Sequence, residues 1–349
     1  MKILVISENG RFLGIAQRLV EEGNNVIFTT YNGSNVGQGI IQKAIPQQTL
    51  KRTDGSLNEN GLEKLIKGII PELVIVEGNT LQGQITSKIR EMRIACFGDA
   101  LISELLQNPD FHSLTWTKLG ILPSEVGGFW NGERFTHIFS LWKDELMIGK
   151  NSGLNVNASA IGRPLKEHKE LNKLIPLLKK HYHRGFIGIN KCQISFIFPL
   201  GFFEIWSGSL TSFFNQLTNM VQPLGRTLDM FFGENLITLP PFPYLNYWNT
   251  SICKDTPIKL NDENKKHFFL IDGERKGSTF YCAAQSGEVG YVTARGVTIQ
   301  ELSRRVYRTV TGFWIPNLQY RTDFGLRVMN LSSPIKIEKN LSLLPSNLQ

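Results

Sequence analysis

The residues best suited to bind a ligand lie in the loop Ser7–Arg11, between an apolar run and an amphipathic one. A strand that feeds a helix presents free backbone N–H groups at the start of the helix, and these groups attract an anion. Arg11 can add a two-pronged contact to phosphate, so Asn9, Gly10 and Arg11 form a candidate phosphate site. The loop lacks the spaced glycines of a dinucleotide-binding fingerprint, and an ordinary tight turn is the alternative interpretation.

Two acidic residues are further candidates. Glu77, with Gly78, directly follows the apolar run Leu73–Val76, and ligands gather at the carboxyl ends of parallel strands. Glu204 follows Phe202-Phe203, which we expect to form a strand with the carboxylate at its end. Such a carboxylate can hold Mg²⁺, although a single carboxylate also fits a solvated strand end. The sequence has no nucleophile elbow, so it offers no support for covalent catalysis.

The elements that position these loops alternate between strand and helix. We expect strands over Lys2–Ser7, Asn25–Thr30, Leu73–Val76 and Ile94–Phe97, separated by amphipathic helices. This alternation predicts a parallel sheet with helices on both faces. Residues 1–105 are therefore predicted to form a doubly wound α/β domain.

The rest of the chain has a different pattern. Residues 106–245 contain an aromatic hairpin over Gly128–Leu141 and a basic helix over Lys166–His181. We assign residues 246–349 to a small β-rich domain with antiparallel strands over His267–Val292, a helix over Ile299–Val310 and a closing strand over Tyr320–Val328. The run Gly273–Gly277 resembles a phosphate loop only superficially, and we interpret it as a hairpin turn.

Composition indicates a soluble globular protein with an anionic partner. The 349 residues include 38 Lys and Arg against 30 Asp and Glu, a net charge of +8. No signal peptide or membrane span is recognisable, so we expect a cytoplasmic location. The four cysteines are too scattered in sequence to predict a metal knuckle or a redox pair.

One stretch of the middle region is strongly basic. Eight Lys or Arg and two Glu lie between Arg163 and Lys191. A solvated helix face explains this charge, and binding of nucleic acid is the weaker alternative.

Three separated segments resemble one family, phosphoribosylamine-glycine ligase, an ATP-grasp enzyme of purine synthesis. The most specific segment runs from Gly290 to Gly325 and follows the family's Val-Thr-x-x-Gly-x-Thr, a helix containing Ala-Tyr, and Tyr-Arg-x-Asp-Ile-Gly. The residues in register are Tyr307, Tyr320, Arg321, Asp323 and Gly325. The resemblance implies a ligand-binding role for Arg321.

The amino-terminal half carries weaker similarities to the same family. Met1–Arg11 is similar to its opening strand and Gly-Gly-Arg-Glu-His loop, and Leu73–Gly78 occupies the place of its Val-Val-Gly-Pro-Glu loop. Gly127–Glu133 resembles the Glu-Gly-x-Phe-x-Gly-Glu run of phage-type members. Asn151–Ala160 corresponds to the family's glycine-rich substrate loop, which implies substrate contacts for Gly153 and Asn155.

The chain departs from the family where the nucleotide is held. The family's segment ending Gly-Ile-Pro resembles Lys118–Pro123, and an entire ATP-clamping subdomain follows it there, whereas Pro123 is separated here from Gly127 by three residues. The family's metal motif corresponds to Glu204–Gly208, which keeps the glutamate but has Trp206 and Gly208 in place of Asn and Arg. Loss of a metal ligand and a cation weakens binding of Mg-nucleotide.

We therefore expect an α/β fold in three parts: the doubly wound domain, a truncated ATP-grasp core and the β-rich domain. The preferred hypothesis is a degenerate ligase that binds a phosphorylated ribosyl compound or nucleotide, or a protein partner that supplies the missing subdomain. The alternative is an active ATP-dependent ligase that joins an amine to an amino acid. ATP and Mg²⁺ are the implied cofactors if the protein is active, and none is expected otherwise.

Overall fold

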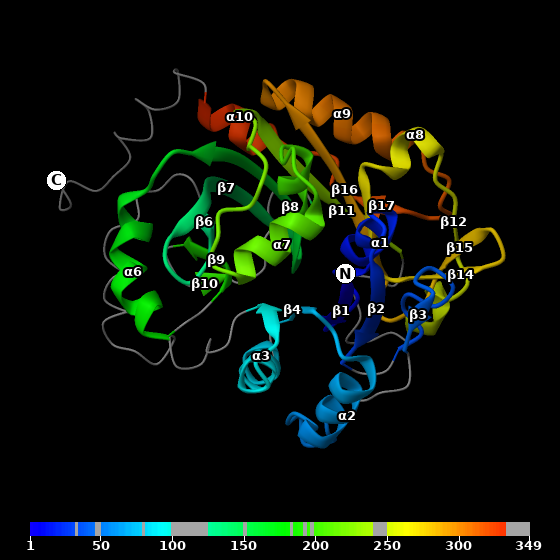
Figure 1. Cartoon of the computed structure of the whole chain (residues 1–349). Helices are drawn as coiled ribbons and strands as arrows, with labels where there is room; N and C mark the ends of the chain where they lie inside the picture. Colours follow the sequence, from blue (N-terminus) through cyan, green and yellow to red (C-terminus); the bar gives the residue numbers. More distant parts are fainter. Residues whose placement is uncertain are drawn as a thin grey trace.

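The computed structural model describes residues 1–31, 34–45, 50–78, 81–98, 125–148, 152–181, 184–190, 194–195, 199–239 and 250–332 (Figure 1). The segment Lys118–Pro123 lies outside these residues. Among the residues described, no helix is long and apolar enough to cross a membrane.

A parallel sheet of five strands forms the amino-terminal part, in the order β3-β2-β1-β4-β5. Its elements are β1 (Lys2–Ser7), α1 (Leu13–Glu21), β2 (Asn25–Thr30), β3 (Lys43–Ala44), α2 (Glu59–Ile69), β4 (Leu73–Glu77), α3 (Gln82–Glu91) and β5 (Ala95–Phe97). Successive side chains of a strand point to opposite faces. Ile3 and Val5 accordingly pack in the core that contains α1, and Leu4 and Ile6 in the core that contains α2 and α3. The predicted doubly wound arrangement is confirmed.

A larger, antiparallel sheet of nine strands follows, in the order β10-β9-β6-β7-β8-β11-β16-β13 with β17 beside β11. Its strands are β6 (Glu125–Trp130), β7 (Phe135–Ile148), β8 (Ser152–Leu165), β9 (Gly185–Asn190), β10 (Ile194–Ser195), β11 (Phe231–Thr238), β13 (Phe268–Leu270), β16 (Glu288–Gly296) and β17 (Gln319–Tyr320). The sheet thus crosses the predicted boundary at residue 245.

Helices cover both faces of the large sheet. Leu171 and Leu174 of α6 (Lys169–His181) pack against Trp130 on one face. Phe129 contributes to the opposite core, which also holds Phe213 of α7 (Leu210–Thr218). Figure 1 shows α9 (Ile299–Thr311) and α10 (Leu326–Ser332) on the far side of the molecule from α2 and α3.

A small sheet completes the carboxyl-terminal part, with the order β12-β15-β14. It contains β12 (Pro257–Ile258), β14 (Gly273–Lys276) and β15 (Thr279–Cys282), and η3 (Thr250–Cys253) and α8 (Asp262–Lys265) lie in the same part of the chain. The hairpin of β14 and β15 turns at Gly277, so the prediction of a hairpin over Gly273–Gly277 is confirmed.

The predicted closing strand over Tyr320–Val328 is wrong. Only Gln319 and Tyr320 pair with β11, and α10 begins at Leu326. Arg321 Nε donates to the Asp323 carboxylate two residues later (2.6 Å), which favours a turn. Gly325 then has a positive φ of 84°, a conformation open to glycine that an extended strand does not contain.

The predicted strand at Phe202-Phe203 is also wrong, because Leu200–Glu204 forms a 3₁₀ helix, η1. Leu200, Phe202 and Phe203 are all buried, as they could also be in a strand covered on both faces, so their apolar character does not distinguish the two conformations. The turn is held by Gly201, whose N–H donates to the Glu234 carboxylate (3.1 Å). A Cβ at Gly201 would lie 2.7 Å from the Gly233 carbonyl oxygen, so the backbones of η1 and β11 touch.

The structure brings two of the four cysteines into contact as free thiols. Cys253 and Cys282 are both buried, and their sulfur atoms lie 3.7 Å apart. The two residues are 29 positions apart, and the small sheet brings them together. Sequence spacing alone carried no signal of this contact.

Candidate functional site

The first candidate site lies at the carboxyl ends of β1, β2 and β4. We call Ser7, Glu8, Arg11, Tyr31 and Glu77 the sheet-edge cluster. Ser7 Oγ donates to Glu77 Oε2 (2.5 Å), and Glu8 N–H donates to the Glu77 carbonyl oxygen (3.0 Å). Burial raises the pKa of Glu77, although the bond from Ser7 and the charge of Arg11 oppose the shift. The loops predicted from Glu8 and Glu77 therefore meet.

Tyr31 directly follows β2 and is buried at this edge of the parallel sheet. Its side chain is fully buried, and its hydroxyl has no hydrogen-bond partner among the residues that the structure describes. A Cβ at Gly78 would lie 2.5 Å from this hydroxyl and 2.9 Å from Glu8 Cβ. Burial, followed by the charges of Glu77 and Glu8, raises the pKa of Tyr31, so the phenol stays neutral and can donate or accept.

Arg11 is held by the other sheet. Its Nη2 lies 3.4 Å from Glu234 Oε1 on β11, and its guanidinium lies 4.6 Å from the centre of the Tyr291 ring on β16. Burial alone would lower the pKa of Arg11, but Tyr291 and Glu234 outweigh it and raise the pKa. The positive charge of Arg11 is thus balanced by the Glu234 carboxylate and the Tyr291 ring.

Asn9 and Gly10 have different roles in this loop. Asn9 is exposed, whereas Gly10 is buried with a φ of 85°. A Cβ at Gly10 would lie 2.6 Å from the Ile271 carbonyl oxygen. Close packing of the loop on the carboxyl-terminal part therefore requires glycine here.

The antiparallel sheet also brings Glu288 to this region. Burial raises the pKa of Glu288 to about 7, with Arg11 opposing the shift and Asp272 and Glu77 adding to it. Sequence analysis missed Tyr31, Glu234, Tyr291 and Glu288. A glutamate within the mostly apolar strand segment Phe231–Thr238 was a usable signal for Glu234, and the place of Tyr31 directly after β2 was a signal for Tyr31.

Arg321 lies elsewhere, in an acidic setting. Its side chain is 2% exposed, its Nε and Nη2 contact both oxygens of Asp323 (2.6 and 3.0 Å), and its Nη2 lies 3.7 Å from Asp144 on β7. The Arg321 carbonyl oxygen accepts from Asn235 Nδ2 (2.8 Å). These contacts tie the carboxyl-terminal turn to the large sheet.

Gly153 and Asn155 lie on β8, in the large antiparallel sheet. Asn155 pairs with Leu146 near the turn between β7 and β8. The part of β8 that pairs with β11 is Ser159–Gly162, further along the strand. These two candidates therefore lie in a different sheet from β1, which leads into the loop of Asn9 and Gly10.

Glu204 ends η1, and its carboxylate is already bonded. His267 Nδ1 lies 3.0 Å from Oε2, and Thr293 Oγ1 donates to Oε1 (2.5 Å). Burial alone would raise the pKa of Glu204, but His267, Thr293 and Arg18 together lower it. Glu204 therefore lies with His267 and Thr293, in a centre separate from the sheet-edge cluster.

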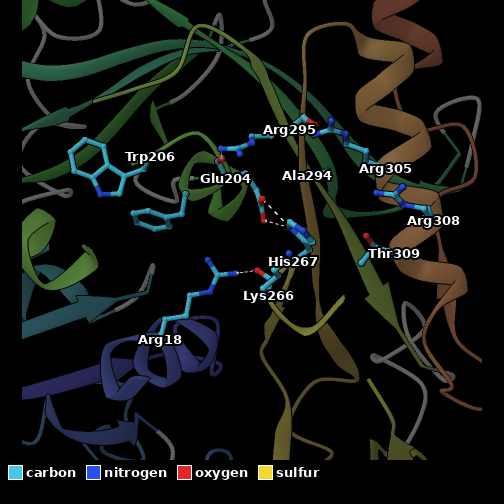
Figure 2. A pocket seen from close by; sticks show the side chains of 11 residues that line it. Arg18, Glu204, Trp206, Lys266, His267, Ala294, Arg295, Arg305, Arg308 and Thr309 are labelled. Atoms are coloured by element: carbon cyan, nitrogen blue, oxygen red, sulfur yellow. Dashed lines mark hydrogen bonds and ion pairs between the residues drawn. The ribbon is translucent and has the colours of Figure 1, made fainter. Parts of the chain in front are cut away.

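A cavity of about 440 Å³ opens around Glu204. Figure 2 shows cationic side chains around it from α1, β16, α9 and the segment before β13. We call this cavity the basic pocket, and its cations are Arg18, Lys266, Arg295, Arg305 and Arg308. Helix α9 presents its arginines because Leu302, Val306 and Val310 bury the opposite stripe.

A metal ion does not fit at Glu204. Its carboxylate accepts hydrogen bonds from two protein groups, and Arg18 and Arg295 stand where further carboxylates would be needed. Across the described residues, no group of three or more His, Cys, Asp or Glu could hold a metal ion. The arrangement suits an anion.

Comparisons with known proteins add information about the fold. No protein-family model matches the sequence, and no curated protein matches it. The solved structure of phosphoribosylamine-glycine ligase from Thermotoga maritima is similar, with a TM-score of 0.60, 12% identity, and coverage of 93% of this chain and 100% of that chain.

Carboxylases share the same architecture. The biotin carboxylase domain of a single-chain bacterial carboxylase has a TM-score of 0.57 at 8% identity, with 96% of this chain and 94% of that chain covered. For Kluyveromyces lactis urea carboxylase the TM-score is 0.59 at 8% identity, and 97% of this chain spans 32% of that chain. The chain thus has the mixed α/β fold of ATP-grasp proteins.

Proposed function

We propose that this protein is a ligase-fold protein that has lost ATP-dependent ligation and binds a phosphoribosyl compound or nucleotide at the sheet-edge cluster. The similar structures are named as a ligase and carboxylases, and proteins of this fold generally use ATP and Mg²⁺. Loss of ATP-dependent ligation would therefore set this protein apart from the similar structures.

Two observations support the loss of ATP chemistry. Only three residues separate Pro123 from Gly127, and β6 begins at Glu125, so the segment enters the sheet at once. The carboxylate of Glu204 is surrounded by cations and bonded by His267 and Thr293. Phosphoryl transfer depends on positioned phosphates and charge stabilisation, and these residues offer neither a clamp nor a metal site.

The unpartnered Tyr31 hydroxyl is the observation that carries the ligand proposal. A buried polar group without a partner costs free energy, and a ligand hydroxyl would supply the partner. The carboxylates of Glu8 and Glu77 can accept from further hydroxyls, and the absence of a side chain at Gly78 lets Glu8 and the Tyr31 hydroxyl lie close to each other. A ribosyl group provides several adjacent hydroxyls, which fits this set of acceptors.

The phosphate of such a ligand would lie on the solvent side of the Glu8 and Glu77 carboxylates. Asn9 is exposed at the start of α1, where backbone N–H groups favour an anion. Arg11 is engaged by Glu234, so in this proposal it orders the loop and contributes its positive field. A protein partner that supplies the missing subdomain remains part of the proposal.

Calorimetric titration with ribose 5-phosphate tests the ligand site. We expect binding by the native protein and about tenfold weaker binding by Tyr31→Phe, since the variant removes only the hydroxyl. Tyr281→Phe, on the β15 hairpin, is the matched control and should bind as the native protein does. Equal affinity for Tyr31→Phe and the native protein would refute the site.

A second assay tests the loss of activity. The protein is incubated with ATP, Mg²⁺, glycine and ribose 5-phosphate plus ammonia, and release of ADP is followed. We expect no release above the rate without protein. ADP release that depends on glycine would instead establish the alternative, an active ligase.

A further inference from the structure

The basic pocket lies apart from the sheet-edge cluster and belongs to no function described above. Its lining comes from three distant parts of the chain: Arg18 on α1, Glu204 and Trp206 at or just after the end of η1, and residues 266–309, which supply Lys266 and the arginines of β16 and α9. Figure 2 shows these side chains around one opening. A volume of about 440 Å³ is in the range of small-molecule sites.

The charges of this lining are largely uncompensated. It holds five Lys and Arg but a single carboxylate, Glu204, which is bonded to His267 and Thr293. Arg18 Nη2 donates to the Lys266 carbonyl oxygen (2.6 Å), and Arg295 Nη1 donates to the Glu204 carbonyl oxygen (2.9 Å). A carbonyl oxygen accepts a hydrogen bond but carries no net charge, and the Arg18 guanidinium also lies over the Phe269 ring, 3.6 Å from its centre. Neither contact supplies a full negative charge to these two arginines.

The remaining three cations differ in whether they have a charge partner. Arg305 Nη2 pairs with Glu301 Oε1 (2.6 Å) on its own helix. The Lys266 ammonium and the Arg308 guanidinium are exposed and have no side-chain partner among the residues that the structure describes. Two exposed donors, on Lys266 and Arg308, therefore line the pocket beside Arg18 and Arg295, which already donate to carbonyl oxygens.

The half-buried Arg18 is the cation of this lining most affected by its surroundings. Burial lowers the pKa of Arg18 even though Glu204, Glu21 and Glu22 oppose the shift. An anion in the pocket would add negative charge beside this guanidinium. Trp206 contributes a wall and no donor, because its ring packs on His137 and Phe213, to one side of the cations (Figure 2).

We propose that the basic pocket binds a small molecule that carries a diphosphate group. Guanidinium groups bind phosphate oxygens through paired hydrogen bonds, and several of them on different elements suit two adjacent phosphates better than one. A single phosphate can reach only part of a lining that extends from α1 to α9. The lining converges on one hollow from α1, η1, β16 and α9, which favours a small anion over a nucleic-acid strand.

The experiment is a calorimetric titration of the full chain with sodium diphosphate at constant ionic strength, without metal. We expect saturable binding, with affinity at least tenfold above that for inorganic phosphate. Arg308→Gln should weaken the affinity about tenfold, which is the effect of one charge-assisted contact. Arg304→Gln is the matched control, because Arg304 is an exposed arginine of the same helix outside the pocket lining, and its affinity should not change.

A second variant, Lys266→Gln, guards against a structural effect at α9, and the same loss of affinity is expected. ADP in place of diphosphate separates the possible sources: tighter binding of ADP assigns the site to a nucleotide, and equal binding assigns it to the diphosphate group alone. Equal losses in Arg304→Gln and Arg308→Gln, equal binding of phosphate and diphosphate, or binding of RNA without binding of diphosphate would each overturn the proposal. Ribose 5-phosphate binding at Tyr31 is unaffected by Arg308→Gln, so the two sites are tested independently.

Discussion

At the edge of the parallel sheet the cation Arg11 lies between Glu234 and the Tyr291 ring, whereas in the basic pocket the carboxylate of Glu204 lies among cations. Both centres join the amino-terminal and carboxyl-terminal parts of the chain. The first uses a buried ion pair to hold the loop in place, and the second leaves several positive charges without counter-charges. Charged residues that have partners therefore stabilise the fold, whereas charged residues without partners indicate where an anion binds.

The largest effect is expected from a fully compensated cation. Arg321→Met leaves Asp144 and Asp323 without their buried partner, so the free energy of unfolding should fall by about 3–5 kcal/mol in a denaturant titration. Arg327→Met is the control, because Arg327 is 50% exposed and lies 3.5 Å from the same Asp144. A loss below 1 kcal/mol for Arg321→Met would show that compensation does not matter for stability.

A smaller loss is expected where the loop of the sheet-edge cluster touches the carboxyl-terminal part. Gly10→Ala places a Cβ 2.6 Å from the Ile271 carbonyl oxygen in a backbone with φ of 85° and should cost about 2–3 kcal/mol. Gly23→Ala has φ of 86° with no atom within 4 Å, so it isolates the cost of the conformation, about 1 kcal/mol. Thermal unfolding measures both, and equal losses would contradict the close contact.

Glu288 makes the region around the sheet-edge cluster sensitive to pH. Its pKa in the folded protein is raised from 4.5 to about 7, so the folded state holds this proton more tightly than the unfolded chain does. The resulting stability is complete below pH 4.5 and is lost as pH rises through 7. Native protein should lose about 1–2 kcal/mol between pH 5 and pH 8 relative to Glu288→Gln, an estimate reduced for partial solvent contact. Parallel pH profiles for the two proteins would contradict this.

The smallest effect is expected in the basic pocket. Arg308→Gln removes an exposed cation with no partner among the described residues and should change the unfolding free energy by less than about 0.5 kcal/mol. The unfolding free energy of the variant should also depend on salt differently from that of the native protein. Removal of one of several like charges should make the variant relatively more stable at low ionic strength. A loss above 1 kcal/mol would reveal a structural role for Arg308.

Much of the fold could be predicted from the sequence because local patterns determine it. The apolar runs of β1 and β2 gave their ends correctly, and the spacing of Leu302 and Val306 gave α9 to within one residue. The run at Phe202 misled the prediction because a buried 3₁₀ turn and a buried strand have the same composition. Backbone contact between Gly201 and Gly233, which decides between them, is a tertiary feature.

The candidate sites were less predictable, for a similar reason. Glu8 and Glu77 could be predicted together because parallel strands place their carboxyl ends at one edge. The partner of Arg11 is 223 residues away on another sheet, and the cations of the basic pocket are spread from residue 18 to residue 308. No spacing rule connects such residues before the two sheets are packed together.

The central claim is best tested by hydrogen exchange measured by mass spectrometry with and without diphosphate. On addition of diphosphate we expect slower exchange in peptides from residues 200–207 and 299–311, which line the basic pocket. Exchange in peptides from residues 7–12 and 73–78 should not change. Protection confined to residues 7–12 and 73–78 would contradict it, because the anion would then bind where the cation is already compensated.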